Sequence, residues 1–167
     1  MNIFDVHIKN GEVIDGTGAP KFKSDIVIDK GKIIGVFPAE NGDVRDPSEN
    51  HFLSNFKAKH TINAENKIIS PGFIDVHTHD DDNVFLDPSM SSKISQGVTT
   101  CVAGNCGISL APFSYKGEVP APIALLGKSE VFRFPRVSDY KEEFNNKPSS
   151  VNLALLTGHS MLRVEAM

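Results

Sequence analysis

The first 70 residues carry short stretches in which apolar and polar side chains alternate, the pattern of strands with one buried face. Residues 4–15 alternate on both sides of Asn10 and Gly11, a dipeptide typical of hairpin turns. Residues 24–37 alternate again around a lysine–glycine–lysine turn. Together these stretches predict a meander of small antiparallel strands, the N-terminal β-sandwich part of the protein, over residues 1–70.

Two further segments belong to this N-terminal region. Residues 38–58 are rich in turn-forming and charged residues without clean periodicity, and we interpret them as an exposed loop insertion. Residues 60–70 predict one more hairpin. At Pro71 the composition changes.

From residue 71 to residue 167 the pattern alternates between apolar strands and helices. The predicted strands cover residues 72–79, 98–105 and 151–159. Helix-start signals occur at Asp87 with Pro88 and at Ser138, and Gly97 follows the first helix. Strand–helix alternation of this kind predicts a parallel sheet or barrel.

The length of the alternating part determines how much of a barrel it can form. A (β/α)8 barrel needs ~250 residues, whereas residues 71–167 supply the first three βα units. We therefore expect an α/β fold, the start of a (β/α)8, TIM-like barrel preceded by a small β-sandwich segment. The chain is expected to be the N-terminal portion of a larger protein.

Composition and charge argue against several classes of function. The net charge of -4 offers no basic surface for nucleic acid, and no apolar run reaches the ~18 residues of a membrane span. The N-terminus lacks the basic and apolar regions of an export signal, which predicts a cytoplasmic protein. Cys101 and Cys106 lie within one strand-like segment, so we expect free thiols or thiolate ligands.

His77 and His79 follow one another at the end of the first predicted barrel strand. Because alternate strand residues share a face, Asp75 and both histidines are expected to point the same way. Neutral imidazole is the commonest metal ligand, and barrel active sites lie at this end of the strands. The alternative is a half-exposed strand end with incidental histidines. Asp75 is expected either to orient an imidazole or to bond nearby backbone.

Two later strands end in further candidate ligands. Cys106 closes the second strand between glycines that let backbone approach closely, and His159 closes the third in the same relative position. A thiolate ligand favours zinc over magnesium or calcium. The alternative for Cys106 is a small buried residue, and Cys101, in mid-strand, is expected in the core.

An acidic run, Asp80 to Asp82, follows the two histidines. Such a run is usually a solvated surface loop. The alternative is that Asp80 or Asp81 lines the mouth of the site.

Four sequence motifs resemble one known family. They are GEVIDGTGAP, PGFIDVHTHDD, QGVTTCVAGNCGISLAP and VNLALLTGHSMLR. The segment PGFIDVHTH marks the amidohydrolase superfamily as a whole, dihydroorotases and hydantoinases included, whereas QGVTT with GNCG and SLAP is much narrower. From about Phe4 to its end, the chain resembles the N-acyl-D-amino-acid deacylases, or D-aminoacylases.

That resemblance implies a zinc-dependent enzyme that hydrolyses the amide bond of N-acyl-D-amino acids and releases a carboxylate and a D-amino acid. It implies a barrel with a β-sandwich built from both chain ends. His77 and His79 would supply one metal position, and Cys106 would be the thiolate ligand of a second, tighter zinc position. Two more histidines and the general-base aspartate would lie beyond residue 167, so the chain alone is expected to be inactive.

The resemblance also bears on several supporting positions. His159 and Arg163 match the family by position, although the family usually has Gly-His-Gly-Thr/Ser-Leu-Arg where this chain has GHSMLR. With Asp75 and Asp81, they are the residues we expect to support the metal ligands or contact substrate.

Two other functions stay open. One is a cyclic-amide hydrolase of the dihydroorotase or hydantoinase type; in dihydroorotases a carboxylated lysine bridges two metals. No lysine closes a predicted strand here, and Cys106 supplies a soft ligand instead. The other is a non-catalytic, metal-binding fragment, since three parallel strands leave a sheet edge unpaired.

Overall fold

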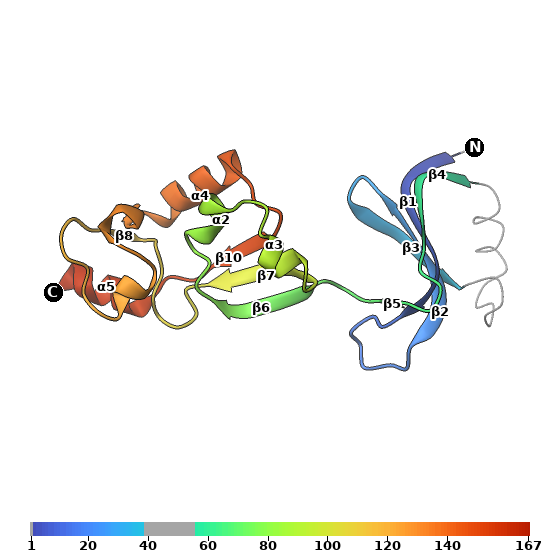
Figure 1. The fold of residues 1–167 in the computed structure, drawn as a ribbon, viewed down its shortest axis with the longest axis horizontal. Coiled ribbons are helices and arrows are strands. Elements are labelled where there is room, and N and C mark those ends of the chain that lie inside the picture. Colours follow the sequence, from blue (N-terminus) through green and yellow to red (C-terminus); the bar gives the residue numbers. More distant parts are fainter. Residues whose placement is uncertain (1, 39–55) are drawn as a thin grey trace. The chain divides into compact units, whose positions relative to one another are not determined.

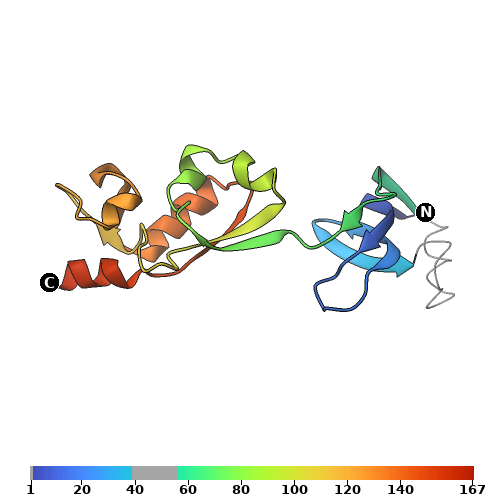
Figure 2. The same ribbon diagram turned by 60° about the horizontal axis from the view of Figure 1, so that its bottom comes forward.

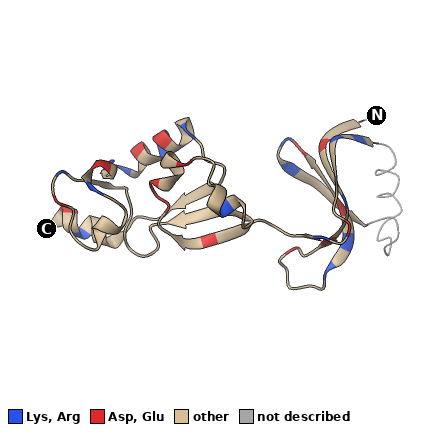
Figure 3. Cartoon of the chain, viewed as in Figure 1, with Lys and Arg blue, Asp and Glu red and all other residues tan. Residues whose placement is uncertain are grey.

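A computed structural model of the chain describes residues 2–38 and 56–167. These residues form two compact units that divide between Pro71 and Gly72 (Figures 1 and 2). Most of the insertion expected at residues 38–58 lies outside the described residues. Acidic and basic residues are interspersed along each unit (Figure 3). Among the described residues, no helix is long and apolar enough to cross a membrane.

The first unit is a five-stranded sheet in the order β3-β2-β1-β4, with β5 also paired to β1. Its strands are β1 (Asn2–Val13), β2 (Phe22–Asp29), β3 (Lys32–Pro38), β4 (Phe56–Asn63) and β5 (Ile68–Ile69). β1, β2 and β3 run antiparallel as predicted, and Lys30 and Gly31 form the turn between β2 and β3, both at positive φ. The second layer of the expected β-sandwich stays a prediction.

Asn10 and Gly11 form a β-bulge instead of the expected hairpin turn. β1 continues through them, and its pairing with β2 shifts register between Ile8 and Gly11. Asn10 adopts the left-handed conformation at φ 64°, and its backbone N–H donates to the Asp25 carboxylate at 2.9 Å. Because asparagine tolerates this conformation in bulges as well as turns, the dipeptide alone did not distinguish the two.

The hairpin expected over residues 60–70 is also wrong. In the described sheet, β4 and β5 both lie parallel to β1. β1 is 12 residues long, so β4 pairs with its segment from Asn2 to Lys9 and β5 pairs with Glu12 and Val13. The sheet is therefore mixed and not the antiparallel meander that the alternating pattern predicted.

The second unit contains a parallel sheet in the order β10-β7-β6 (Figure 1). Its strands are β6 (Phe73–Thr78), β7 (Val98–Ala103) and β10 (Asn152–Leu155). A short antiparallel pair, β8 (Phe113–Ser114) and β9 (Arg133–Phe134), forms within the connection that follows β7. The parallel pairing confirms the predicted strand–helix alternation. The barrel stays a prediction, because these three strands form an open sheet.

Short helices lie between these strands, and one more follows the last of them. They are α2 (Asn83–Leu86), α3 (Ser91–Ile94), η1 (Ile123–Leu125), η2 (Ser129–Val131), α4 (Val137–Asn146) and α5 (His159–Ala166). The predicted cap of α4 at Ser138 is wrong, because the helix begins earlier. Arg136 is the N-cap residue, and its backbone N–H donates to the Asp139 carboxylate at 3.2 Å.

The predicted start of the first helix at Asp87 and Pro88 is also wrong. α3 begins at Ser91, after Met90 in the left-handed conformation at φ 46°. The Asp87 carboxylate instead accepts a hydrogen bond from the Ser89 hydroxyl at 2.5 Å. Asp87 and Pro88 therefore belong to a turn before α3, although aspartate followed by proline is also the pattern of a helix start.

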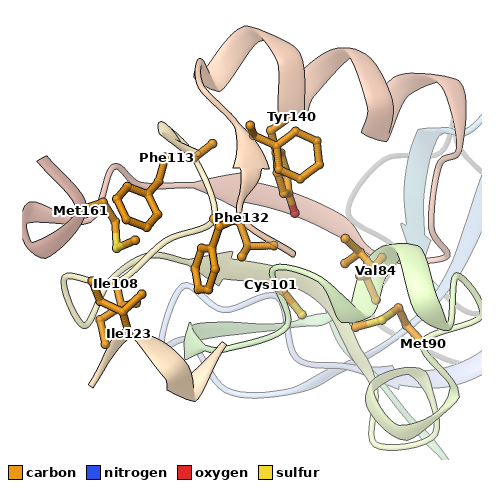
Figure 4. Close-up of a cluster of buried hydrophobic side chains, with 13 residues drawn as sticks. Val84, Met90, Cys101, Ile108, Phe113, Ile123, Phe132, Tyr140 and Met161 are labelled. Carbon is orange, nitrogen blue, oxygen red and sulfur yellow. The ribbon is translucent and has the colours of Figure 1, made fainter. Parts of the chain in front are cut away.

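The core of the second unit gathers around β7 and the connections that follow it (Figure 4). Phe113 and Phe132 are buried and meet edge to face, with ring centroids 5.5 Å apart. Cys101 is 0% exposed, which confirms its predicted place in the core. Leu110 and Met161 are also fully buried. This packing anchors the loops that carry the candidate site.

Candidate metal centre

Three candidate ligands converge where β6 and β7 end. His77 lies in β6, His79 directly follows that strand, and Cys106 lies in the turn after β7. One ligand atom from each side chain lies within 4.8 Å of the others, and all three side chains are exposed. The convergence follows from the topology, because neighbouring parallel strands end at the same edge of a sheet.

The spacing of the Cys106 and His79 donors fits ligation of a zinc ion. Sγ of Cys106 lies 3.8 Å from Nδ1 of His79, and the imidazole centroids of His77 and His79 are 5.8 Å apart. Zn–S bonds of ~2.3 Å and Zn–N bonds of ~2.0–2.1 Å place tetrahedral sulfur and nitrogen ligands about 3.6 Å apart. Imidazole and thiolate are donors that zinc prefers, whereas magnesium and calcium take oxygen ligands.

The turn that carries Cys106 is fixed to both neighbouring strands. Gly104 has a φ of 84°, and a Cβ there would lie 2.1 Å from the Leu156 carbonyl oxygen, so only glycine allows this close approach. The side-chain amide of Asn105 donates to the Val76 carbonyl of β6 at 2.8 Å. We expected close backbone approach at the glycines, but we did not single out Asn105. The signal that could have identified Asn105 is its position next to the candidate ligand Cys106 in the sequence.

Asp75 does not keep to the strict alternation that we expected for β6. Between Asp75 and Thr78, β6 advances three residues while β7 advances two, so the strand is bulged. One Asp75 oxygen lies 2.7 Å from Nζ of Lys93, and the other accepts the backbone N–H of His77 at 3.3 Å. The hydrogen bond with Lys93 lowers the pKa of Asp75. The structure shows the backbone contact, and an imidazole-orienting role stays a prediction.

Asp81 is fully buried, which corrects the expectation of a solvated or mouth-lining position. One carboxylate oxygen accepts the N–H of Leu110 at 3.3 Å, and Oδ2 has no hydrogen-bond partner among the described residues. The Asp81 backbone carbonyl accepts the Tyr140 hydroxyl at 2.6 Å. Burial raises the pKa of the carboxyl to about 6. Asp81 therefore connects the loop after β6 to the loop after Cys106 and to α4.

His159 and Arg163 both lie on α5, with exposed side chains. His159 is the first residue of that helix and lies four positions beyond the end of β10, so it does not close the strand as predicted. It is not part of the three-residue cluster. The start of α5 nevertheless packs on the turn that carries Cys106, since the Ser160 N–H donates to the Gly107 carbonyl at 2.9 Å.

Comparison with known proteins identifies the family. Residues 60–167 match the model of the amidohydrolase family. The D-aminoacylase of Alcaligenes xylosoxydans xylosoxydans is 39% identical over 165 residues, which cover 98% of this chain and 31% of that protein. The chain thus spans about a third of the length of the relatives that it matches.

Two solved structures are also similar. A D-aminoacylase, studied for the functional role of its binuclear metal centre, is 44% identical with a TM-score of 0.84, over 98% of this chain and 31% of that one. The N-acyl-D-glutamate deacylase from Bordetella bronchiseptica, complexed with zinc and a phosphonate inhibitor, is 38% identical with a TM-score of 0.84, over 99% of this chain and 32% of that one. These identities confirm the resemblance of the motifs to N-acyl-D-amino-acid deacylases. The chain belongs to the amidohydrolase family.

Proposed function

We propose that this chain carries part of the site of a zinc-dependent hydrolase that cleaves N-acyl-D-amino acids into a carboxylate and a D-amino acid. The observation that carries this proposal is the convergence of His77, His79 and Cys106 within 4.8 Å. Similarity to a D-aminoacylase and to an N-acyl-D-glutamate deacylase supports the substrate class.

His77, His79 and Cys106 would hold zinc. The resemblance implies one metal position at the two histidines and a second at Cys106, and the ligand atoms of all three lie within 4.8 Å of one another. When bound, zinc supplies a Lewis acid for the amide carbonyl and lowers the pKa of a bound water to ~7. The chain contributes two imidazoles and a thiol at one exposed edge of the sheet, where a substrate has access. The contacts of Gly104 and Asn105 keep the thiol at that edge.

Amide hydrolysis also needs a general base, because a proton must pass from the attacking water to the leaving amine. Asp75 and Asp80 flank the two histidines, and both form ion pairs with Lys93, at 2.7 Å and 2.9 Å. The hydrogen bond with Lys93 lowers the pKa of Asp75, so that carboxylate is a weak base. This pairing supports the expectation that the base is an aspartate beyond residue 167, and we expect the 167-residue chain alone to bind metal without turnover.

A cyclic-amide hydrolase of the dihydroorotase type is the nearest enzymatic alternative. Its bridging lysine is expected further along the barrel, and Lys93, the lysine beside the histidine pair, is not suited to take that place. Partial burial acts to lower the pKa of Lys93, but its hydrogen bonds to Asp75 and Asp80 outweigh burial and raise that pKa, so the amine stays protonated. Cys106 supplies a soft ligand in the cluster instead, and the similarity to a D-aminoacylase supports linear amides as substrates.

The test is to assay the zinc-loaded, full-length protein on N-acetyl-D-methionine, N-acetyl-L-methionine and dihydroorotate. We expect hydrolysis of the D-substrate only, its loss in Cys106→Ser, and its retention in the matched variant Cys101→Ser. Turnover of dihydroorotate alone would support the cyclic-amide alternative. Full activity on the D-substrate without bound metal would contradict the zinc assignment.

A further inference from the structure

A second polar cluster lies between α3 and the end of β6, formed by Lys93, Asp75, Thr78 and Asp80. Nζ of Lys93 lies 2.7 Å from Asp75 Oδ2 and 2.9 Å from Asp80 Oδ2, and it donates to the Thr78 hydroxyl at 3.2 Å. The Thr78 hydroxyl in turn donates to the Asp80 carboxylate. The side chains of Lys93 and Asp80 are 20% and 16% exposed. The Asp75 side chain is 30% exposed, so this is a closed but only partly buried set of charges.

Three members of the cluster lie before, between and after the two histidines in the sequence. Asp75 lies two residues before His77, Thr78 lies between the histidines, and Asp80 directly follows His79. A single side chain from α3 therefore contacts every polar residue that flanks the two candidate ligands. The Asp75 carboxylate also accepts the backbone N–H of His77, so the link reaches the main chain of a ligand.

The bulge in β6 explains how one strand contributes both to the polar cluster around Lys93 and to the candidate metal ligands. Without it, Asp75 and Thr78 would point to opposite faces, because they are three residues apart. The extra residue in β6 lets both contact Lys93, while His77 stays exposed beside Cys106. The conformation that presents the histidines is thus the one that Lys93 binds.

Charge makes Lys93 hard to replace within this cluster. Two carboxylates, Asp75 and Asp80, face one ammonium group in a partly buried setting. Removing the ammonium would leave two like charges close together with reduced solvation, and they would separate by moving the backbone that carries them. That backbone includes His77 and His79.

We propose that Lys93 is a positioning residue for the candidate metal centre, holding the bulged end of β6 in the conformation that presents His77 and His79 to Cys106. This inference rests on the proposed function, because it presupposes a metal ion at those three residues. A purely structural role for Lys93, tying α3 to β6, would affect stability but not the geometry of metal binding.

The experiment is a titration of the metal-free protein with Co²⁺, which reports thiolate ligation through a sulfur-to-cobalt charge-transfer band. The variants are Lys93→Met, which removes the charge, and Lys93→Arg, which keeps it. Lys141→Met, at an exposed position of α4, is the matched control. We expect Lys93→Met to weaken Co²⁺ binding about 10-fold to 100-fold, the usual effect of losing a group that supports metal ligands, and Lys93→Arg to restore most of it.

Two further measurements distinguish a failure of the proposed role of Lys93 from a variant that does not fold and from the absence of the metal site. If Lys93→Met does not fold, as judged by circular dichroism, Asp75→Asn and Asp80→Asn each remove one ion pair, and each is expected to weaken Co²⁺ binding. Wild-type affinity and an unchanged band in the folded variants would overturn the role of Lys93. A wild-type protein whose Co²⁺ band is absent, or is unaffected by Cys106→Ser, would instead overturn the metal site itself.

Discussion

Sγ of Cys106 lies 3.8 Å from Nδ1 of His79, although 27 residues separate them in the sequence. The parallel pairing of β6 with β7 brings their C-terminal ends together, and the Asn105 amide fixes the turn after β7 to the Val76 carbonyl. The contact is therefore a product of strand register and one side-chain hydrogen bond.

The two cysteines should differ sharply in reactivity. Cys106 is exposed, whereas Cys101 is buried and its thiol pKa is raised by burial. Because the thiolate is the nucleophile, native protein should react with a disulfide reagent at Cys106 at least about tenfold faster than at Cys101. Labelling rates of Cys106→Ser and Cys101→Ser measure each thiol separately. Zinc should protect Cys106, and an unchanged labelling rate with zinc would count against ligation.

Asn105→Ala should weaken zinc binding by about tenfold or more, because the turn that carries Cys106 loses its tie to β6. Asn152→Ala is the matched control, since the Asn152 amide donates to the Thr99 carbonyl at 3.3 Å in a similar strand-to-strand contact. Competition with a chromophoric chelator gives both affinities. Equal zinc affinities in the two variants would show that the Asn105 contact does not position the ligand.

Gly104→Ala should destabilise the second unit by more than about 1 kcal/mol, because it combines positive φ with a clash against the Leu156 carbonyl oxygen. Gly107→Ala is the control. Its φ of 91° is similar, but the nearest atom to its added Cβ is Oγ of Ser160 at 3.8 Å. Urea unfolding followed by tyrosine fluorescence compares them. If Gly107→Ala loses as much stability as Gly104→Ala, the positive φ alone explains the loss and the clash with the Leu156 carbonyl contributes nothing.

Asp81 should make the metal-free protein less stable as pH rises. The pKa of its carboxyl is about 6 in the folded chain, against an ordinary value of 3.8, so the folded state holds the proton between these values while the unfolded state loses it. The free energy of unfolding therefore falls from about pH 4 to pH 6, by about 3 kcal/mol for this group alone.

Asp81→Asn removes this titration and keeps a carbonyl oxygen that can accept the Leu110 N–H. The variant should be more stable than wild type at pH 7.5, by about 1–3 kcal/mol, and should show no such gain near pH 4. Urea unfolding at both values measures the difference. Asp139→Asn is a control of opposite sign, because the hydrogen bond to Arg136 lowers the pKa of Asp139. A gain for Asp81→Asn that is equal at both pH values would contradict the burial argument.

The parts of the structure that the sequence predicted depend on local pattern. Alternating strands and helices after Pro71 indicated a parallel sheet, and parallel strands end at one edge. That topology alone makes His77, His79 and Cys106 candidates for a common site. The same reasoning failed for His159, because β10 ends at Leu155 and a helix begins where the strand was expected to continue.

The parts that could not be predicted depend on register and tertiary contact. The bulge in β6 places Asp75 against Lys93, and no spacing in the sequence signals an extra residue in a strand. Asp81 looks like a surface residue within an acidic run, yet the packing of the loop after Cys106 buries it. Asn10 carries a signal that turns and bulges share, and only its pairing with β2 decides between them.

The central claim is that the cluster of His77, His79 and Cys106 binds zinc through both imidazole and thiolate, and zinc X-ray absorption spectroscopy tests it most directly. Zinc-loaded protein should show nitrogen ligands at ~2.0–2.1 Å together with a sulfur ligand at ~2.3 Å. The sulfur contribution should vanish in Cys106→Ser and persist in Cys101→Ser. A coordination shell of nitrogen and oxygen alone in the wild-type protein would contradict the site.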